Sequence, residues 1–176
     1  MRMVTTSTGR AKGALTFGQG ESTKGVISTV VAHTRPHVSD ERVRFAGTVT
    51  FDRATVGHIG DILVPTVDSV LDSLGLAKKD FVLSVVNPDA ASASDLGVEI
   101  SGFSADAPTF LALLSAALTM PIPDDIVTTG HVASCDGDIA AVKAIPAKIS
   151  AALDDKSIRC FIYPAPDNDG SLSALS

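Results

Sequence analysis

The sequence predicts a mixed α+β domain, and three of its features indicate that class. Short apolar runs rich in β-branched residues predict strands. One long stretch with apolar residues at three- and four-residue steps predicts a helix. A further helix precedes the last predicted strand, which is typical of a crossover connection. With 176 residues, the chain is long enough to bury a core of its own.

The two ends of the chain differ in composition from its centre. Residues 1–24 are rich in Thr, Ser and Gly, and we interpret them as a flexible polar tail with at most one short strand at residues 14–17. Residues 167–176 form a second polar tail. The domain itself is expected over residues 25–166.

The predicted strands are bounded by Gly, Pro, Asn and Asp, which favour turns. They lie at residues 26–33, 42–51, 81–86, 98–100, 126–132, 139–142 and 160–163. Asn87 and Pro88 end the third of them, and residues 90–95 are predicted to be a loop of small side chains.

Helices are predicted at residues 55–76, 110–118 and 145–153. The first should end near Gly75 and be delayed or kinked at its start by Pro65. The second is apolar nearly all round, which predicts a buried helix. The third tolerates Pro146 because the first turn of a helix needs no N–H there.

Composition disfavours several classes of partner. The net charge is −6 and aromatic residues are 5% of the chain, so we expect neither a basic face for nucleic acid nor a platform for stacking bases. The longest apolar stretch is too short for a bilayer, which needs about 20 residues. The N-terminal sequence has no apolar signal core, and a cytoplasmic protein without membrane contact is expected. Two cysteines, Cys135 and Cys160, exclude a disulfide scaffold and are interpreted as buried, inert thiols.

Motifs for metal or phosphate binding are missing from the sequence. No phosphate-binding loop, C-x-x-C or H-E-x-x-H pattern occurs. His33 and His37 are close in sequence but flank a predicted turn, which disfavours a metal site there. We interpret His58 and His131 as isolated, hydrogen-bonded residues. We therefore expect no metal and no cofactor.

Ser104 is the first candidate for chemistry. It lies in Gly-Phe-Ser-Ala-Asp, where a predicted strand leads into the buried helix. A serine at such a junction exposes its Oγ, and the free N–H groups of the helix start can stabilise an oxyanion. The alternative is that Ser104 is an N-cap, a position that serine favours.

Lys148 is the second candidate. It lies on or beside the apolar stripe formed by Ile145, Ile149 and Ala152 of the last helix. Burial lowers the pKa of a lysine, and a neutral amine can act as a general base. The alternative is a lysine at the helix flank whose amine reaches solvent. A serine nucleophile needs a neighbouring base, and this chain offers a Ser–Lys pair.

Residues 98–164 resemble the C-terminal half of the proteolytic domain of Lon proteases. The family's Gly-Pro-Ser-Ala-Gly motif, which precedes an apolar helix, corresponds to residues 102–106. Its Met-Thr-Gly strand corresponds to residues 128–130, and its Gly-Val-x-x-Lys-Ile-like helix to residues 144–149. The family strand that ends in Pro corresponds to residues 160–164.

The resemblance implies a Lon-like fold of mixed sheets, with a long helix, a buried helix after the serine and a helix that carries the lysine. It implies a Ser–Lys dyad, with Ser104 as nucleophile and Lys148 as general base. Thr129 would support the lysine, and Phe103 and Ala105 would flank the nucleophile. The implied activity is that of a serine endopeptidase that cleaves unfolded or flexible polypeptides.

The resemblance also implies a homo-oligomeric ring, hexameric in the family. The sequence contains no AAA+ ATPase module, so we expect ATP-independent cleavage, a separate AAA+ ATPase partner, or an excised end of a longer protein.

Three residues depart from the family pattern: Phe103 replaces Pro, Asp106 replaces Gly, and His131 replaces an acidic residue. A carboxylate at Asp106 suits a helix start but would oppose an oxyanion if it pointed into the site. Two alternatives stay open. One is a catalytically degenerate Lon-fold domain that serves as an oligomerisation or accessory interaction module. The other is an unrelated α/β domain in which Ser104 only caps a helix.

Overall fold

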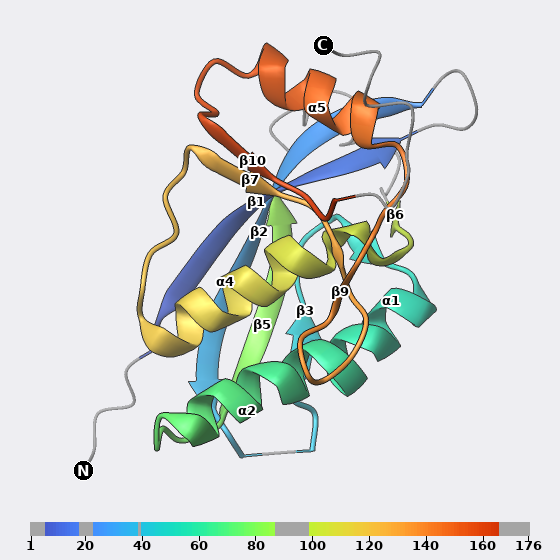
Figure 1. The fold of residues 1–176 in the computed structure, drawn as a ribbon. Coiled ribbons are helices and arrows are strands. Elements are labelled where there is room, and N and C mark those ends of the chain that lie inside the picture. Colours follow the sequence, from blue (N-terminus) through green and yellow to red (C-terminus); the bar gives the residue numbers. More distant parts are fainter. Residues whose placement is uncertain (1–5, 18–22, 39, 87–98, 166–176) are drawn as a thin grey trace.

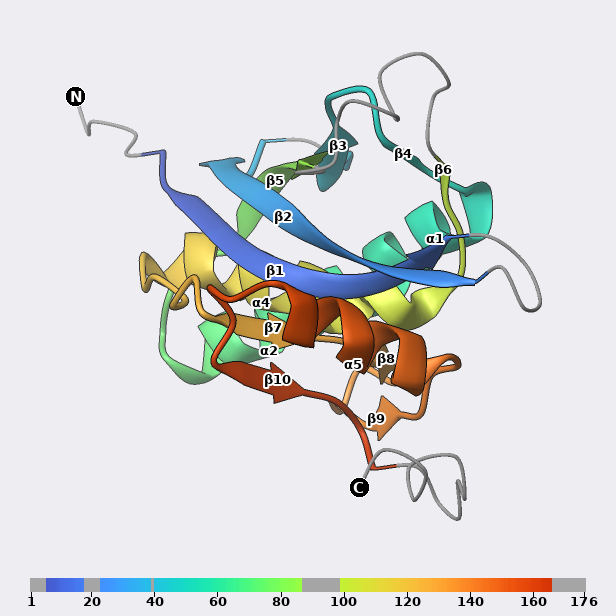
Figure 2. The ribbon, with the colours of Figure 1, turned by 90° about the horizontal axis from the view of Figure 1, so that it is seen from above.

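The computed structural model describes residues 6–17, 23–38, 40–86 and 99–165, and a mixed six-stranded sheet organises them in the order β10-β7-β1-β2-β5-β3. Its strands are β1 (Thr8–Phe17), β2 (Lys24–Pro36), β3 (Val43–Phe45), β5 (Lys79–Val86), β7 (Ile126–Thr128) and β10 (Cys160–Ile162). Strand β2 pairs antiparallel with both β1 and β5. Strand β3 pairs parallel with β5, and β7 pairs parallel with both β1 and β10. Figure 2 shows that β1 and β2 form a long, curved ribbon.

Helices pack on both faces of this sheet. One face carries α4 (Asp106–Leu118) and a long composite helix built from α1 (Arg53–His58), η2 (Ile59–Leu63) and α2 (Val64–Ser73) (Figure 1). The opposite face carries α5 (Ile145–Asp154), which packs on Ala14 and Ile27 of β1 and β2. Because side chains alternate along a strand, each face receives its own apolar cluster. The predicted α+β class is confirmed.

Strand β1 lies where a flexible tail was expected. The prediction of a tail over residues 1–24 is wrong for residues 8–13, and the short strand expected at residues 14–17 is the end of β1, which pairs with β2 along its whole length. Gly9 and Gly13 face α4 so closely that a Cβ at Gly9 would clash with the α4 backbone, and one at Gly13 would lie 2.6 Å from a proline carbon. Small residues, which looked typical of a tail, are what allow this strand and helix to touch.

The long helix forms where its apolar period predicts it. Asp52 caps α1 by accepting a hydrogen bond from the Thr55 amide at 2.7 Å. The turn η2 is a wider, π-helical turn, closed by a bond from the Val64 amide to the Ile59 carbonyl. Pro65 follows at once and lacks an N–H, so the helix accommodates it by widening rather than by breaking. Gly75, at φ +67°, lies just past the helix end, as predicted.

Two predicted strands are each divided in two. The segment 42–51 separates into β3 and β4 (Thr50–Phe51) because Gly47, at φ +98°, turns the chain between them. The segment 126–132 separates into β7 and β8 (His131–Val132). β4 pairs with β6 (Glu99–Ile100), and β8 pairs with β9 (Ile139–Ala140), so both second halves leave the main sheet.

The crossover helix before the last strand is confirmed, since α5 connects the parallel strands β7 and β10. The predicted turn and loop at residues 87–95 and the C-terminal tail at 167–176 lie outside the described residues. Within the described part of the chain, no helix has the length and apolarity needed to cross a bilayer.

Candidate active site

Ser104 lies at the junction of β6 and α4. Gly102, at φ +76°, turns the chain after β6, and the short 3-10 turn η3 (Phe103–Ala105) then leads directly into α4. Phe103 and Ser104 begin this turn, so their amides have no acceptor within it. The half-buried Ser104 side chain therefore lies beside free N–H groups, as its sequence position predicts.

The Ser104 hydroxyl does not cap the helix. The N-cap position of α4 is Ala105, which makes no side-chain capping bond, and η3 also has none. Across the described residues, Oγ of Ser104 makes no hydrogen bond. Its main chain is nevertheless well fixed, because the Ser104 carbonyl accepts bonds from the Thr129 hydroxyl at 3.1 Å and the Gly130 amide at 3.4 Å. The hydroxyl is thus held in place by the backbone but is not itself engaged.

Lys148 is buried in the second turn of α5, with 1% of its surface exposed. It shares the inward face of the helix with Ile145 and Ala152, which are also buried. The prediction of an inward lysine is confirmed, and the solvent-reaching alternative is wrong. Burial lowers the pKa of Lys148 from 10.5 to about 8, since no carboxylate offsets the desolvation. A substantial fraction of the amine is therefore neutral at mildly alkaline pH.

Thr129 connects the lysine to the serine residue. The Lys148 amine donates a hydrogen bond to Oγ1 of Thr129 at 3.1 Å, and the same hydroxyl donates to the Ser104 carbonyl at 3.1 Å. Thr129 directly follows β7, which pairs with β10, and the Thr129 amide donates a hydrogen bond to the Ile162 carbonyl of β10. The sheet therefore fixes Thr129, and through it the Lys148 amine is held near the main chain of Ser104.

Ser104 and Lys148 open onto one cleft of about 340 Å³. One wall is the segment from Ser101 to Ser104, and the other is the segment from Ala141 to Lys143, which follows β9. Thr16 and His131 complete the lining. Ser104 reaches the cleft from η3, ahead of α4, and Lys148 reaches it from α5, on the other face of the sheet. No hydrogen bond joins Oγ of Ser104 to Nζ of Lys148, whose bond goes to Thr129.

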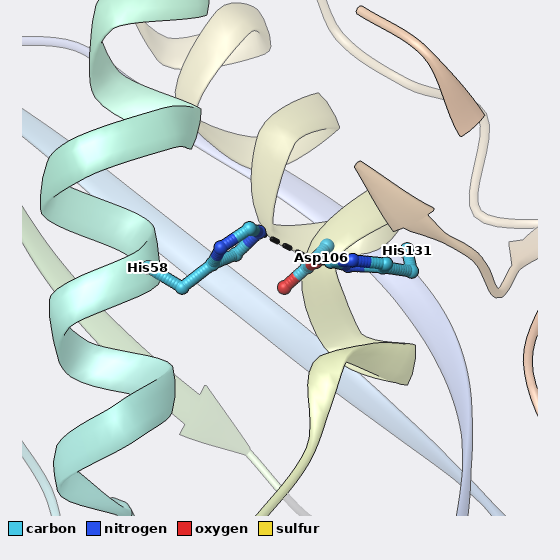
Figure 3. A group of neighbouring side chains, drawn as sticks. All are labelled: His58, Asp106 and His131. Atoms are coloured by element: carbon cyan, nitrogen blue, oxygen red, sulfur yellow. Dashed lines mark hydrogen bonds and ion pairs between the residues drawn. The ribbon is translucent and has the colours of Figure 1, made fainter. Parts of the chain in front are cut away.

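Asp106 forms a second cluster beside this cleft, with His58 and His131. Its carboxylate is 1% exposed, and Oδ2 accepts hydrogen bonds from Nδ1 of His131 at 2.7 Å and the Val132 amide at 3.2 Å. Nε2 of His58 lies 3.0 Å from the same oxygen. Figure 3 shows the two imidazoles on opposite sides of the carboxylate. Burial raises the pKa of Asp106, although the hydrogen bond from His131 opposes this effect.

The aromatic ring of Phe103 joins this cluster to the cleft. Its centroid lies 4.5 Å from that of His58 and 4.7 Å from that of His131. On its other side, Phe103 borders an open depression of about 710 Å³ that Arg53, Gly57, Asp61 and Ile62 also line. Phe103 therefore separates two recesses next to Ser104.

The expectation that His58 and His131 are hydrogen-bonded is confirmed, but they are not isolated, because both contact Asp106. They come from the end of α1 and the start of β8, so no spacing in the sequence connects them. The sequence places Asp106 beside Ser104 but gives no sign of its histidine partners. Imidazole nitrogens and carboxylate oxygens are ligand types that metal ions use in proteins.

The other candidate residues lie away from the cleft. His33 contacts the Thr8 hydroxyl, and His37 contacts Asp80, so the two imidazoles have different partners. Cys135 and Cys160 are exposed, and the prediction of buried thiols is wrong. Cys160 begins the edge strand β10, and Cys135 lies in the turn between β8 and β9. Both places are exposed for reasons of topology, which amino-acid composition does not show.

Comparison with protein-family models and with curated proteins gives no match for this chain. Interpretation of the site therefore relies on its geometry and chemistry.

Proposed function

We propose that the chain is a serine peptidase with a Ser104–Lys148 dyad. The observation that carries this proposal is a buried amine, without a charged partner, in the same cleft as an unengaged serine hydroxyl. Burying a lysine without a charged partner costs folding free energy. Side chains with perturbed pKa values cluster at functional sites. The resemblance to Lon proteases, drawn from the sequence, points to the same two residues.

The reaction follows from these two groups. Oγ of Ser104 attacks a peptide carbonyl while the neutral Lys148 amine takes its proton, and the resulting ammonium then gives that proton to the leaving amine. Water attacks the acyl-enzyme next, its proton passing to the lysine, and the serine leaves with a proton restored. In the substrate-free structure the amine bonds to Thr129, and catalytic hydrogen bonds tighten when substrate binds.

The start of η3 supplies the electrostatic part of the mechanism. The free amides of Phe103 and Ser104 are suited to stabilise the negative oxygen of the tetrahedral intermediate. The Asp106 carboxylate would oppose that charge, but its Oδ2 is occupied by His131 and the Val132 amide. The cleft between residues 101–104 and 141–143 suits an extended segment of a flexible polypeptide.

The first test is cleavage of casein or a fluorogenic peptide without ATP. The variants Ser104→Ala and Lys148→Met should each lower the rate by roughly 1,000-fold or more, because members of a catalytic pair act as a unit. Ser69→Ala and Lys156→Met, exposed residues of the same types, should cleave like the wild type. Circular dichroism checks that all variants are folded.

A covalent readout makes this test sharper. A fluorophosphonate should modify the wild type on the peptide that contains Ser104, and Lys148→Met should slow that modification. Full cleavage by a folded Ser104→Ala or Lys148→Met variant would reject the dyad. A chain that neither cleaves nor reacts, but forms a defined ring in solution, would favour the alternative of an assembly module.

A further inference from the structure

The cluster of His58, Asp106 and His131 takes no part in the proposed proton transfers. Its members come from the end of α1, the start of α4 and the start of β8, and their ligand atoms all lie within 4.8 Å of one another. We propose that these three side chains form a binding site for a divalent transition-metal ion of the Zn²⁺ type.

The donor set selects the class of ion. Two imidazole nitrogens and one carboxylate oxygen suit Zn²⁺ and its neighbours, whereas Mg²⁺ and Ca²⁺ prefer oxygen ligands throughout. Zn²⁺ bonds of about 2.0–2.1 Å place tetrahedral ligands roughly 3.4 Å apart. The two nitrogens lie at hydrogen-bond distances of 3.0 Å and 2.7 Å from Oδ2 of Asp106, so an ion would require them to move outward by roughly 0.4–0.7 Å.

An orphaned oxygen provides independent support for an ion. Oδ1 of Asp106 is buried and has no hydrogen-bond partner in the described part of the molecule, although the residue is only 1% exposed. A buried carboxylate is costly unless it is paired or coordinates a metal. Both imidazoles contact Oδ2 of Asp106, and neither supplies a partner for Oδ1. A divalent cation between the rings would satisfy both the charge and the unused oxygen.

The surroundings already hold the three ligands in place. The Val132 amide donates to Oδ2 of Asp106 at 3.2 Å, and the Phe103 ring packs against both imidazoles. Such contacts outside the ligands orient a metal site. The His58 and His131 side chains are 13% and 24% exposed, so an ion can reach them from solvent.

Metal binding requires a defined change of tautomer. Nε2 of His58 now lies 2.9 Å from the Val132 carbonyl and serves there as a donor. To bind an ion, Nε2 of His58 and Nδ1 of His131 must present lone pairs, so each ring carries its proton on the other nitrogen. Three protein ligands then leave a fourth position for water, or for the Val132 carbonyl.

The test is Zn²⁺ binding by the full chain after chelator treatment, measured by calorimetry, with Co²⁺ absorption reporting four-coordinate geometry. We expect one equivalent of ion. Loss of a residue that only hydrogen-bonds to a metal ligand lowers the affinity for the ion roughly 10–100-fold. Because His58→Gln and His131→Gln each remove a ligand itself, each should lower the affinity for Zn²⁺ by more than that. His33→Gln and the pair Cys135→Ser with Cys160→Ser remove potential ligands elsewhere and should keep the site.

A second measurement needs no variant and so does not depend on their folding. In ¹⁵N-histidine spectra, Zn²⁺ should shift the Nε2 signal of His58 and the Nδ1 signal of His131, while the His33 signals stay in place. A wild type that binds no stoichiometric ion overturns the proposal. So does binding that survives in folded His58→Gln and His131→Gln, or that disappears in His33→Gln or the double cysteine variant.

Discussion

Among the residues that the structure describes, Lys148 has one hydrogen-bond acceptor, the Thr129 hydroxyl, and no carboxylate to hold its proton. Thr129 in turn bonds to the main chain of Ser104 rather than to its hydroxyl. This arrangement leaves Oγ of Ser104 available to a substrate carbonyl. It also makes the protonation of a single amine the event that controls the proposed reaction.

The pH dependence of cleavage follows from that amine. Because burial lowers the pKa of Lys148 to about 8, the basic form increases as pH rises through that value. We expect kcat/KM to rise roughly tenfold per pH unit well below pH 8 and to level off above it. Rates of peptide cleavage between pH 6 and pH 10 measure this profile. A midpoint near 6.5, the ordinary value of histidine, would indicate a different base.

The sequence predicts Ser104 and Lys148 themselves but not the contacts that connect them to the rest of the site. A serine between a strand and a buried helix, and a lysine on an apolar stripe, are local patterns. The link through Thr129 is not local, because it depends on the pairing of β7 with β10. The contact of Asp106 with His58 and His131 joins three elements and leaves no pattern at all.

At the scale of elements, β1 and α4 pack backbone against backbone. Gly9 lies directly against the α4 backbone, where a Cβ would clash with the Ala112 carbonyl and the Ala116 amide. Main-chain atoms cannot move aside as a flexible side chain can. The position of α4, and with it the position of Ser104, therefore depends on a residue without a side chain.

Gly9→Ala should destabilise the protein by roughly 1–3 kcal/mol, because added bulk in a packed interface forces backbone shifts. Gly57→Ala is the matched control, since a Cβ there meets nothing within 4 Å. In the interior of α1 that change should instead add about 0.5–1 kcal/mol. Urea unfolding measures both. Equal free energies of unfolding for Gly9→Ala and the wild type would contradict the close packing.

Helices were easier to predict than strands. A helix displays its apolar face within the chain, and the boundaries of 55–76 and 110–118 lie close to those observed. The first part of β1, residues 8–13, escaped prediction because glycine and alanine carry little strand propensity. Its character comes from the partners on either side, β2 and β7, which the local sequence cannot show.

At the scale of the whole molecule, Arg42 connects the sheet to the helical layer. Its guanidinium bonds to both oxygens of Asp68 on α2, at 2.8 and 2.9 Å, and to Asp80 on β5 at 3.0 Å. Asp80 is fully buried, and Asp68 is nearly so. Although burial opposes it, hydrogen bonds from His37, Val38 and Arg42 lower the pKa of Asp80.

Arg42→Met should cost about 3–5 kcal/mol of stability, because it removes the guanidinium that bridges two buried carboxylates. Of their basic partners, Asp68 then keeps Lys78, at 3.7 Å, and Asp80 keeps His37. Arg44→Met is the control, since Arg44 pairs with Glu41 at the surface, where such bridges contribute about 0–1 kcal/mol. Thermal and urea unfolding at neutral pH compare the two. Similar losses from both variants would show that Arg42 is an ordinary surface residue.

The order of the strands was beyond sequence reasoning. A crossover helix between β7 and β10 could be predicted, because the chain between them is long enough for one. That β7 joins β1, and β10 joins β7, depends on pairings between segments far apart in the chain. With α4 and α5 on opposite faces of the sheet, the turn η3 that precedes α4 and Lys148 of α5 still line one cleft.

The burial of Lys148 also makes the stability of the fold depend on pH. The unfolded chain holds the lysine proton up to about pH 10.5, whereas the native protein releases it from about pH 8. Below pH 8 both states are protonated, and native Lys148 bears the full cost of a buried charge. Between the two values unfolding takes up a proton, so alkaline conditions relieve that cost. The deprotonation that makes the amine a base thus also raises the stability of the folded state.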